Sequence, residues 1–250
     1  MTARRPVLVG IGLLAGVMSA LFGVGGGAVV VPALVAWCGR DQRQAVATSF
    51  LAIGPLSLAA MIGYALHGEV DVVVALPLIA GSLIGAWIGT HLLTKLPLGV
   101  LRWIFAVFAF GIAIRMAFGT AEPTGAVDHG WRLVWLIPAA VAIGVLAALT
   151  GVGGGAAMVP LMQLGYGLSA VLAKGTSLLV ILPTSALGSW RNLRNGLGSV
   201  PEALWIGCSG MLAALATAQL SVRLPQSVAD RLFAGFLVFV ALRTVWPRRA

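Results

Sequence analysis

The chain has 250 residues, of which 60% are hydrophobic and only 9% are charged. Soluble domains have about a quarter of their residues charged, so this composition excludes a water-soluble globular protein. The 16 Lys and Arg residues exceed the seven Asp and Glu residues, but they are scattered between apolar stretches and form no basic stripe, so nucleic acid is not an expected partner. Apolar stretches of about 20 residues recur along the chain and predict an all-α polytopic membrane protein in contact with a lipid bilayer.

The first apolar stretch, residues 7–38, is too long for a single simple crossing. Its 32 residues would form about 48 Å of helix, whereas the hydrocarbon core of a bilayer is roughly 30 Å thick. The sequence "GVGGG" at residues 23–27 lies near its middle, and each glycine weakens a helix by about 1 kcal/mol relative to alanine. We therefore expect a broken helix here. It can form a hairpin that returns to the side it entered from, or it can cross once.

Three ordinary apolar stretches follow, and we expect each to cross the membrane as a helix. They cover residues 45–66, 72–93 and 98–118. Pro55 lies in the first of them, with Ser57 two residues later, and we expect a kink there. Carbonyl groups freed by a kink can line a path, although ordinary packing explains these residues equally well. Residues 119–130, "GTAEPTGAVDHG", are polar and rich in Gly and Pro, which predicts a linker.

The rest of the chain repeats the first part at a constant offset of 128 residues. Residues 16–34 match residues 144–162 at 12 of 19 positions, where about two matches would arise by chance. The sequence thus predicts two homologous transmembrane repeats, residues 7–118 and 131–246. The second repeat should contain its own glycine-broken helix and then spans at residues 172–194, 200–221 and 226–246. Because the N-terminal stretch has this internal counterpart, we expect it to belong to the fold rather than to a cleaved signal peptide.

Positive charges favour the hairpin form of the broken segments. With hairpins and a cytoplasmic N-terminus, 11 of the 16 Lys and Arg residues lie on the cytoplasmic side, whereas a single crossing places nine of 16 there. Each half then has an odd number of crossings, so the halves are inverted repeats and both termini are cytoplasmic. Inverted repeats with broken helices are typical of secondary transporters.

The two glycine clusters are candidate anion-binding elements. A helix that restarts after glycines presents backbone N–H groups without intrahelical partners and the positive end of its dipole. Such a helix N-terminus binds anions readily, although glycines in membrane helices also serve close packing. The candidate residues are Gly25, Gly26, Gly27 and Ala28 in the first half, and Gly153, Gly154, Gly155 and Ala156 in the second.

Polar residues just after the broken helices complete the candidate site. Two Thr-Ser pairs share a repeat position, Thr48 with Ser49 and Thr176 with Ser177. Their hydroxyls can donate to an oxyanion, or they can cap a helix or bond a backbone carbonyl. Lys174 has Val46 as its counterpart. An ionisable residue inside a membrane segment indicates function, whereas snorkelling from a helix end to the interface is the structural alternative.

Residues for enzyme chemistry are missing from the sequence. No Asp or Glu lies in the middle of an apolar stretch, and Cys38 and Cys208 have neither CxxC spacing nor any relation in the repeat. Metal-binding and nucleophile motifs are absent as well. We therefore expect no metal, no cofactor and no catalytic residues, and we expect that the protein is not an enzyme.

The doubled motif resembles the TauE/SafE family of sulfite exporters. The likeness rests on "GVMSALFGVGGGAVVVPAL" followed by "AVATS", and on "GVLAALTGVGGGAAMVPLM" followed by "KGTS". It extends over both halves and implies a bacterial inner-membrane carrier for sulfur-containing anions, such as sulfite or sulfonate-derived compounds. It marks the glycine clusters, Pro32, Pro160 and the Thr-Ser pairs. The difference between Val46 and Lys174 departs from strict equivalence of the halves.

Together these observations predict a secondary transporter that exports a small sulfur-containing oxyanion bound between the broken helices. Two alternatives stay open. One is a transporter of another small anion, and the other is an accessory or scaffold membrane protein that transports nothing itself.

Overall fold

The computed structural model describes residues 5–97 and 131–223, together with a few single positions between 99 and 114 and at 235 and 238. The described residues form helices and no strands. These helices are α1 (Arg5–Phe22), α2 (Gly27–Cys38), α3 (Gln42–Ala65), α4 (Val72–Lys95), the short 3-10 helix η2 (Trp131–Trp135), α6 (Leu136–Thr150), α7 (Gly155–Tyr166), α8 (Ala170–Arg194) and α9 (Val200–Ser221). The linker at residues 119–130 and the spans expected at residues 98–118 and 226–246 lie outside the continuously described residues.

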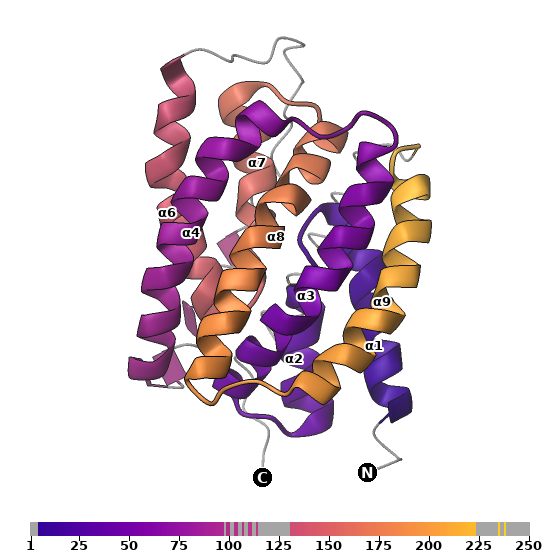
Figure 1. Cartoon of the computed structure of the whole chain (residues 1–250), viewed down its shortest axis with the longest axis vertical. Coiled ribbons are helices and arrows are strands. Elements are labelled where there is room, and N and C mark those ends of the chain that lie inside the picture. The colour runs from indigo at the N-terminus through magenta and orange to yellow at the C-terminus, as the bar shows by residue number, and fades with distance from the viewer. Residues whose placement is uncertain are drawn as a thin grey trace.

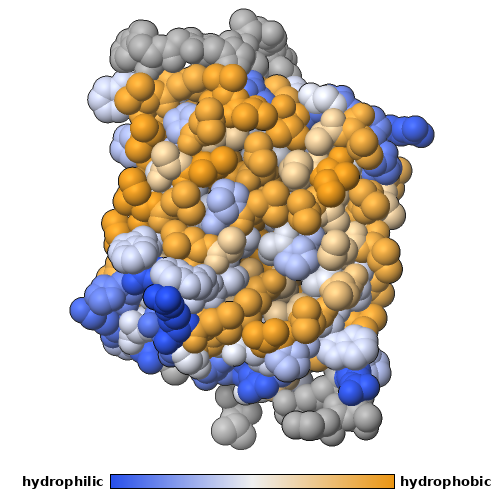
Figure 2. Space-filling view, viewed as in Figure 1, coloured by the Kyte–Doolittle hydropathy of each residue, from blue (hydrophilic) through white to orange (hydrophobic). Residues whose placement is uncertain are grey.

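The prediction of a polytopic helical membrane protein is confirmed. Within the described ranges, six helices are long and apolar enough to cross a bilayer, namely α1, α3, α4, α6 counted from Leu133, α8 and α9. The four ordinary spans expected within these ranges agree with α3, α4, α8 and α9 to within three residues at each end. Figure 2 shows hydrophobic residues over most of the visible side of the bundle and hydrophilic residues mainly towards its two ends, as a membrane-spanning surface requires.

Side-chain caps explain where three of these helices begin. The Asp41 carboxylate accepts a hydrogen bond from Gln44 N at 3.0 Å at the start of α3. Asp71 accepts from Val74 N at 3.0 Å at the start of α4. At the start of α8, Ser169 accepts from Leu172 N at 3.2 Å. Each cap satisfies one of the N–H groups that the first turn of a helix leaves without an intrahelical acceptor.

Both broken segments are hairpins. α1 ends at Phe22 and α2 begins at Gly27, and a Cβ added to Gly26 would lie 2.7 Å from the carbonyl oxygen of Ala15, so the chain folds back along α1. Gly154 lies beside Ile143, the repeat counterpart of Ala15. Gly26 and Gly154 take the left-handed φ values of 82° and 84°, which only glycine adopts without strain. Figure 1 shows α2 returning to the end of the bundle at which the N-terminus lies.

The two halves have opposite orientations and interlock. The connection from α3 to α4 lies at the upper end of the bundle in Figure 1, whereas the connection from α8 to α9 lies at the lower end. α1 packs against α9, and α6 packs against α4. At these crossings Gly16 lies against the backbone of Gly210, and Gly144 lies against the backbone of Ser82. Each broken helix therefore packs on a helix of the other repeat.

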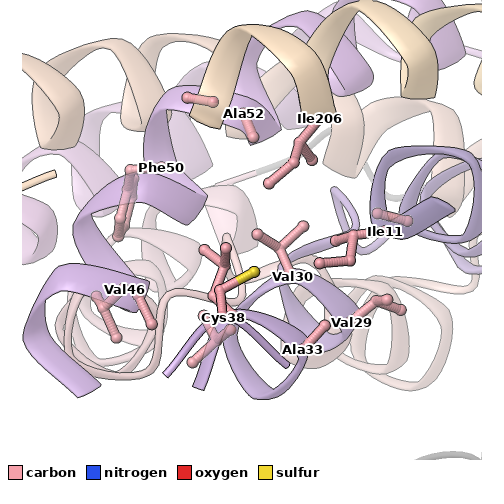
Figure 3. Packing of buried hydrophobic residues seen from close by; sticks show 14 of the residues in the cluster. Ile11, Val29, Val30, Ala33, Cys38, Val46, Phe50, Ala52 and Ile206 are labelled. Atoms are coloured by element: carbon pink, nitrogen blue, oxygen red, sulfur yellow. The ribbon is translucent and has the colours of Figure 1, made fainter. Parts of the chain in front are cut away.

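The core of the bundle is built from residues of several helices. Figure 3 shows Ile11 of α1, Val30 of α2, Phe50 of α3 and Ile206 of α9 directed towards a common cluster. A second buried cluster joins α4, α6, α7 and α8 in the other part of the molecule. Because α2 and α7 contribute to these clusters, apolar packing fixes the position of both half-helices and of the glycine turns before them.

Candidate functional site

The two glycine turns meet each other inside the bundle. We call residues 23–26 the first glycine loop and residues 151–154 the second glycine loop. All residues of both loops are buried. A Cβ on Gly27 would overlap the carbonyl oxygen of Gly151, and a Cβ on Gly155 would overlap the carbonyl oxygen of Gly23. Each loop thus touches, through its backbone, the first residue of the half-helix that follows the other loop, and an added Cβ on Gly153 would lie 3.3 Å from the carbonyl oxygen of Val24 in the first loop.

The two serines of the Thr-Ser pairs hold these loops. The Ser49 hydroxyl donates to the carbonyl oxygen of Gly151 at 2.8 Å. The Ser177 hydroxyl donates to the carbonyl oxygen of Gly23 at 2.7 Å and also lies 2.7 Å from the carbonyl oxygen of Lys174. Each serine therefore bonds the glycine loop of the other repeat. Of the roles left open above, the structure places both hydroxyls on backbone carbonyls.

The two threonines make a second pair of equivalent bonds. Thr48 Oγ1 accepts from Ser199 N at 3.0 Å, and Thr176 Oγ1 accepts from Asp71 N at 2.9 Å. Ser199 and Asp71 are the residues directly before α9 and α4. These bonds connect the starts of α9 and α4 to a helix of the other repeat, α3 and α8 respectively.

The N-termini of α2 and α7 face this central region. In the first turn of α2, Val29 N and Val30 N both donate to Gly26 O. Ala157 N and Met158 N make the same bonds to Gly154 O in α7. The N–H groups that precede these donors in each helix have no acceptor within their own helix. They carry the positive end of the helix dipole into a buried environment where a negative ligand is stabilised.

Two isoleucines fill the space between the loops. Ile53 of α3 and Ile181 of α8 are fully buried and occupy the same repeat position. A Cβ on Gly25 would lie 3.0 Å from Ile53 Cγ2 and 3.4 Å from Ile181 Cδ1, and a Cβ on Gly153 would lie 3.5 Å from Ile181 Cγ2. The sequence analysis did not single out these residues. The sequence does contain a signal for them, because isoleucine occurs at the same repeat position in both halves, one helical turn after each Thr-Ser pair.

Lys174 lies beside the first glycine loop. Its Cα is 2.7 Å from the position that a Cβ on Gly23 would occupy, and Val46 lies in the corresponding place beside Gly151. Lys174 is 3% exposed, which places it inside the bundle rather than on the lipid-facing surface. Its counterpart carries no charge, so the environments of the two loops differ electrostatically.

A further difference between the halves lies in the connection after α2, outside the membrane-spanning segments. The Arg40 guanidinium donates to Glu202 of α9 through Nε at 3.1 Å and through Nη2 at 2.6 Å. Hydrogen bonding to this carboxylate, more than its charge, raises the pKa of Arg40 above the ordinary value. The counterparts are Leu168 and Val74, which are buried in one apolar cluster. Sequence reasoning missed this ion pair because its members are 162 residues apart.

Among the residues that the structure describes, no group of three His, Cys, Asp or Glu side chains gathers to hold a metal ion. The donors near the glycine loops are backbone N–H groups, hydroxyls and one lysine. This set suits an anion, which accepts hydrogen bonds and is attracted by positive charge.

Comparison with known proteins places the chain in a family. The profile described as sulfite exporter TauE/SafE matches residues 1–116 and 136–250. A probable membrane transporter protein of Xylella fastidiosa is 33% identical over 42% of this chain and 41% of its own length. The chain thus spans about two fifths of that relative.

Other relatives align over more of their length. The probable membrane transporter protein YunE of Bacillus subtilis is 28% identical over 80% of this chain and 85% of its own length. A probable membrane transporter protein of Haemophilus influenzae is 24% identical over 93% of this chain and 94% of its own length. No solved structure matches. With two oppositely oriented repeats and a profile match over nearly the whole chain, the protein belongs to the TauE/SafE sulfite exporter family of membrane transporters.

Proposed function

We propose that the protein is a secondary transporter that exports a small sulfur-containing oxyanion, such as sulfite or a sulfonate, across the bacterial inner membrane. The observation that carries the proposal is the buried contact between the two glycine loops, each of which leads into a helix N-terminus. Two such N-termini provide N–H donors and positive dipole ends without a permanent charge at each one. An anion held in this way is bound and can still be released.

In the proposed complex the anion accepts hydrogen bonds from the backbone at the starts of α2 and α7. The contributing residues are Gly25, Gly26, Gly27, Ala28, Gly153, Gly154, Gly155 and Ala156. Lys174 adds positive charge beside the first glycine loop. Thr48, Ser49, Thr176 and Ser177 bond the protein backbone in this structure. Their hydroxyls reach the anion when the loops separate to admit it.

Transport requires the two interlocked repeats to move against each other, so that the central region opens to one side and then to the other. Ile53 and Ile181 fill this region, and the structure therefore represents a closed arrangement of the loops. The membrane potential, negative inside, drives an anion outward with about 2.3 kcal/mol per charge per 100 mV. This potential by itself is able to drive export of a charged oxyanion without a coupled ion.

The positive residues support a cytoplasmic location for the end of the bundle that carries the N-terminus. Five described Lys and Arg residues lie in the connection after α2, in the first turn of α3 or in the last turns of α4 and α8, all of which point to that end (Figure 1). They are Arg40, Arg43, Lys95, Arg191 and Arg194. Positive residues accumulate on the cytoplasmic side of membrane proteins. Combined with the odd number of crossings that the sequence predicts for each half, this proposed orientation implies a cytoplasmic C-terminus as well.

The test is anion efflux from proteoliposomes that contain the purified protein, with sulfite, sulfate, thiosulfate and sulfoacetate loaded in turn. We expect efflux of one sulfur oxyanion, and we expect Gly25→Ala and Gly153→Ala to reduce it because their methyl groups enter the central region. Gly39→Ala is the matched control, since Gly39 also has a left-handed φ of 66° but has open space around it. If neither efflux nor binding of any of the four anions is detected, the accessory or scaffold role is favoured instead.

A further inference from the structure

Ser57 is a buried hydroxyl that the fold leaves without a partner. It lies in α3, two residues after Pro55, and it is 0% exposed. Its Oγ atom has no hydrogen-bond partner among the described residues. Burying a hydroxyl without a hydrogen bond is unfavourable because the group loses its hydrogen bonds to water. Serines in membrane helices usually avoid this by donating to a carbonyl one turn earlier.

Comparison with the equivalent serine of the second repeat shows that the lack of a hydrogen-bond partner at Ser57 is unusual. Ser185 occupies the equivalent position in α8 and is 1% exposed, and its hydroxyl donates to Leu182 O at 2.9 Å. The two serines share a residue type, a preceding proline and a depth in the fold. Of this pair, Ser57 is the member whose hydroxyl has no hydrogen-bond partner among the described residues, so burial and helix position do not explain its lack of a partner.

The Ser57 hydroxyl faces the first glycine loop. A Cβ added to Gly25 would lie 3.2 Å from Ser57 Oγ. Gly25 directly precedes Gly26, the residue that caps α2 at its N-terminus. The free hydroxyl therefore lies next to the same helix N-terminus whose N–H groups have no intrahelical acceptor. At Gly153, the three atoms nearest to an added Cβ belong instead to Val24, Ile181 and Ile53.

We propose that Ser57 is a substrate-binding residue, whose hydroxyl donates a hydrogen bond to an oxygen of a small oxyanion held at the N-terminus of α2. This inference rests on the proposed function and narrows it in two ways. The anion binds closer to the first glycine loop than to the second, so the site does not lie on the symmetry axis of the repeats. A ligand oxygen also supplies the acceptor that the described protein atoms do not offer to Ser57.

The test compares Ser57→Ala with its repeat counterpart Ser185→Ala in the purified protein. Binding of sulfite, sulfate, thiosulfate and sulfoacetate is measured by calorimetric titration, and the thermal stability of the ligand-free protein is measured alongside. We expect Ser57→Ala to weaken binding roughly tenfold to a hundredfold, as for loss of a hydrogen bond to a charged group. We expect Ser185→Ala to change it less than about twofold, because its hydroxyl is already bonded within the protein.

Ligand-free stability gives a readout that separates binding from folding. Ser57→Ala removes an unpartnered hydroxyl, so its melting temperature should equal or exceed that of the wild type. Ser57→Cys retains the size of the side chain with a weaker donor, and it should also lose affinity. If the wild type binds an oxyanion and Ser57→Ala binds it equally well, the role of Ser57 is refuted while the proposed function stands. If the wild type binds none of the four anions, both proposals are refuted.

Discussion

Ser177 and Gly23 belong to different repeats, and the Ser177 hydroxyl donates to the Gly23 carbonyl oxygen at 2.7 Å. The repeat reproduces this bond between Ser49 and Gly151 at 2.8 Å. A carbonyl at a helix break has lost its normal N–H partner, and inside a membrane protein it needs another donor. The two serines therefore donate the hydrogen bonds that replace those lost by the buried carbonyl groups at the two glycine breaks.

Removing one of these hydroxyls should destabilise the protein measurably. We expect Ser177→Ala to lower the free energy of unfolding by about 1–3 kcal/mol, because the Gly23 carbonyl is left buried without this donor. Thr94→Ala is the control, since the half-buried Thr94 near the end of α4 also donates to a backbone carbonyl, His91 O, but through a solvent-exposed hydrogen bond. Thermal unfolding in detergent is the measurement. Equal melting temperatures for the two variants would contradict this role of Ser177.

The ion pair between Arg40 and Glu202 should be replaceable by the apolar pair that the other repeat uses. We expect each single variant, Arg40→Leu or Glu202→Val, to be less stable than the wild type by about 1 kcal/mol or somewhat more, because one partly buried charge loses its partner. The double variant copies Leu168 and Val74, and we expect it to recover most of the loss. A double-mutant cycle on melting temperature measures the coupling, and strictly additive losses would contradict the prediction.

The contribution of Arg40 to stability should not vary with pH in the neutral range. Its folded-state pKa is raised above the ordinary value by the hydrogen bond to Glu202. A raised pKa contributes stability that is fully present below the unfolded-state pKa and is lost only as pH rises through the folded-state pKa. Arginine titrates far above the neutral range in both states. The stability difference between wild type and Arg40→Leu should therefore have no arginine titration between pH 7 and 9, measured by unfolding at each pH.

The crossing of α1 and α9 should tolerate no side chain at Gly16. A Cβ at this position would overlap the backbone of Gly210, so Gly16→Ala forces the helices apart, and we expect a loss of about 1–3 kcal/mol. Gly10 lies in the same helix with no atom within 4 Å of an added Cβ. Gly10→Ala should be neutral or slightly stabilising because alanine is the better helix former. Similar melting temperatures for the two variants would show that α1 does not pack on α9 in this way.

The two isoleucines between the loops should couple stability to transport. We expect Ile181→Ala to lower the free energy of unfolding by about 2–4 kcal/mol, because it leaves a cavity between both glycine loops. If the closed arrangement depends on this packing, the same variant should raise the rate of anion efflux from proteoliposomes. Ile84→Ala on the exposed side of α4 is the control, since Ile84 is 51% exposed. A loss of stability without any change in efflux would separate the isoleucines from the transport path.

The sequence predicts local features of this protein well and long-range partners poorly. Helix length, the position of the glycine breaks and the hairpin form follow from composition, charge and the repeat, all of which are local or periodic. The hydrogen-bond partners of Ser49 and Thr48, Gly151 O and Ser199 N, depend on which segment of the other repeat lies nearby, and the sequence around these residues does not encode that. The ion pair between Arg40 and Glu202 cannot be predicted from the sequence either, because the two residues are 162 positions apart. That the Ser57 hydroxyl has no hydrogen-bond partner can be recognised only when the positions of all neighbouring acceptors are known.

The interlocking of the repeats has a consequence for how the chain is made. α1 can pack against α9 only after nearly the whole chain has been synthesised. The carbonyl group of Gly23 likewise has no Ser177 hydroxyl to bond until a residue 154 positions later has been added. During translation the first repeat must therefore remain in the bilayer with an unfinished interior. We expect a ribosome-released fragment that ends before α8 to be recognised as incomplete and degraded, while the same fragment co-expressed with the missing half is rescued.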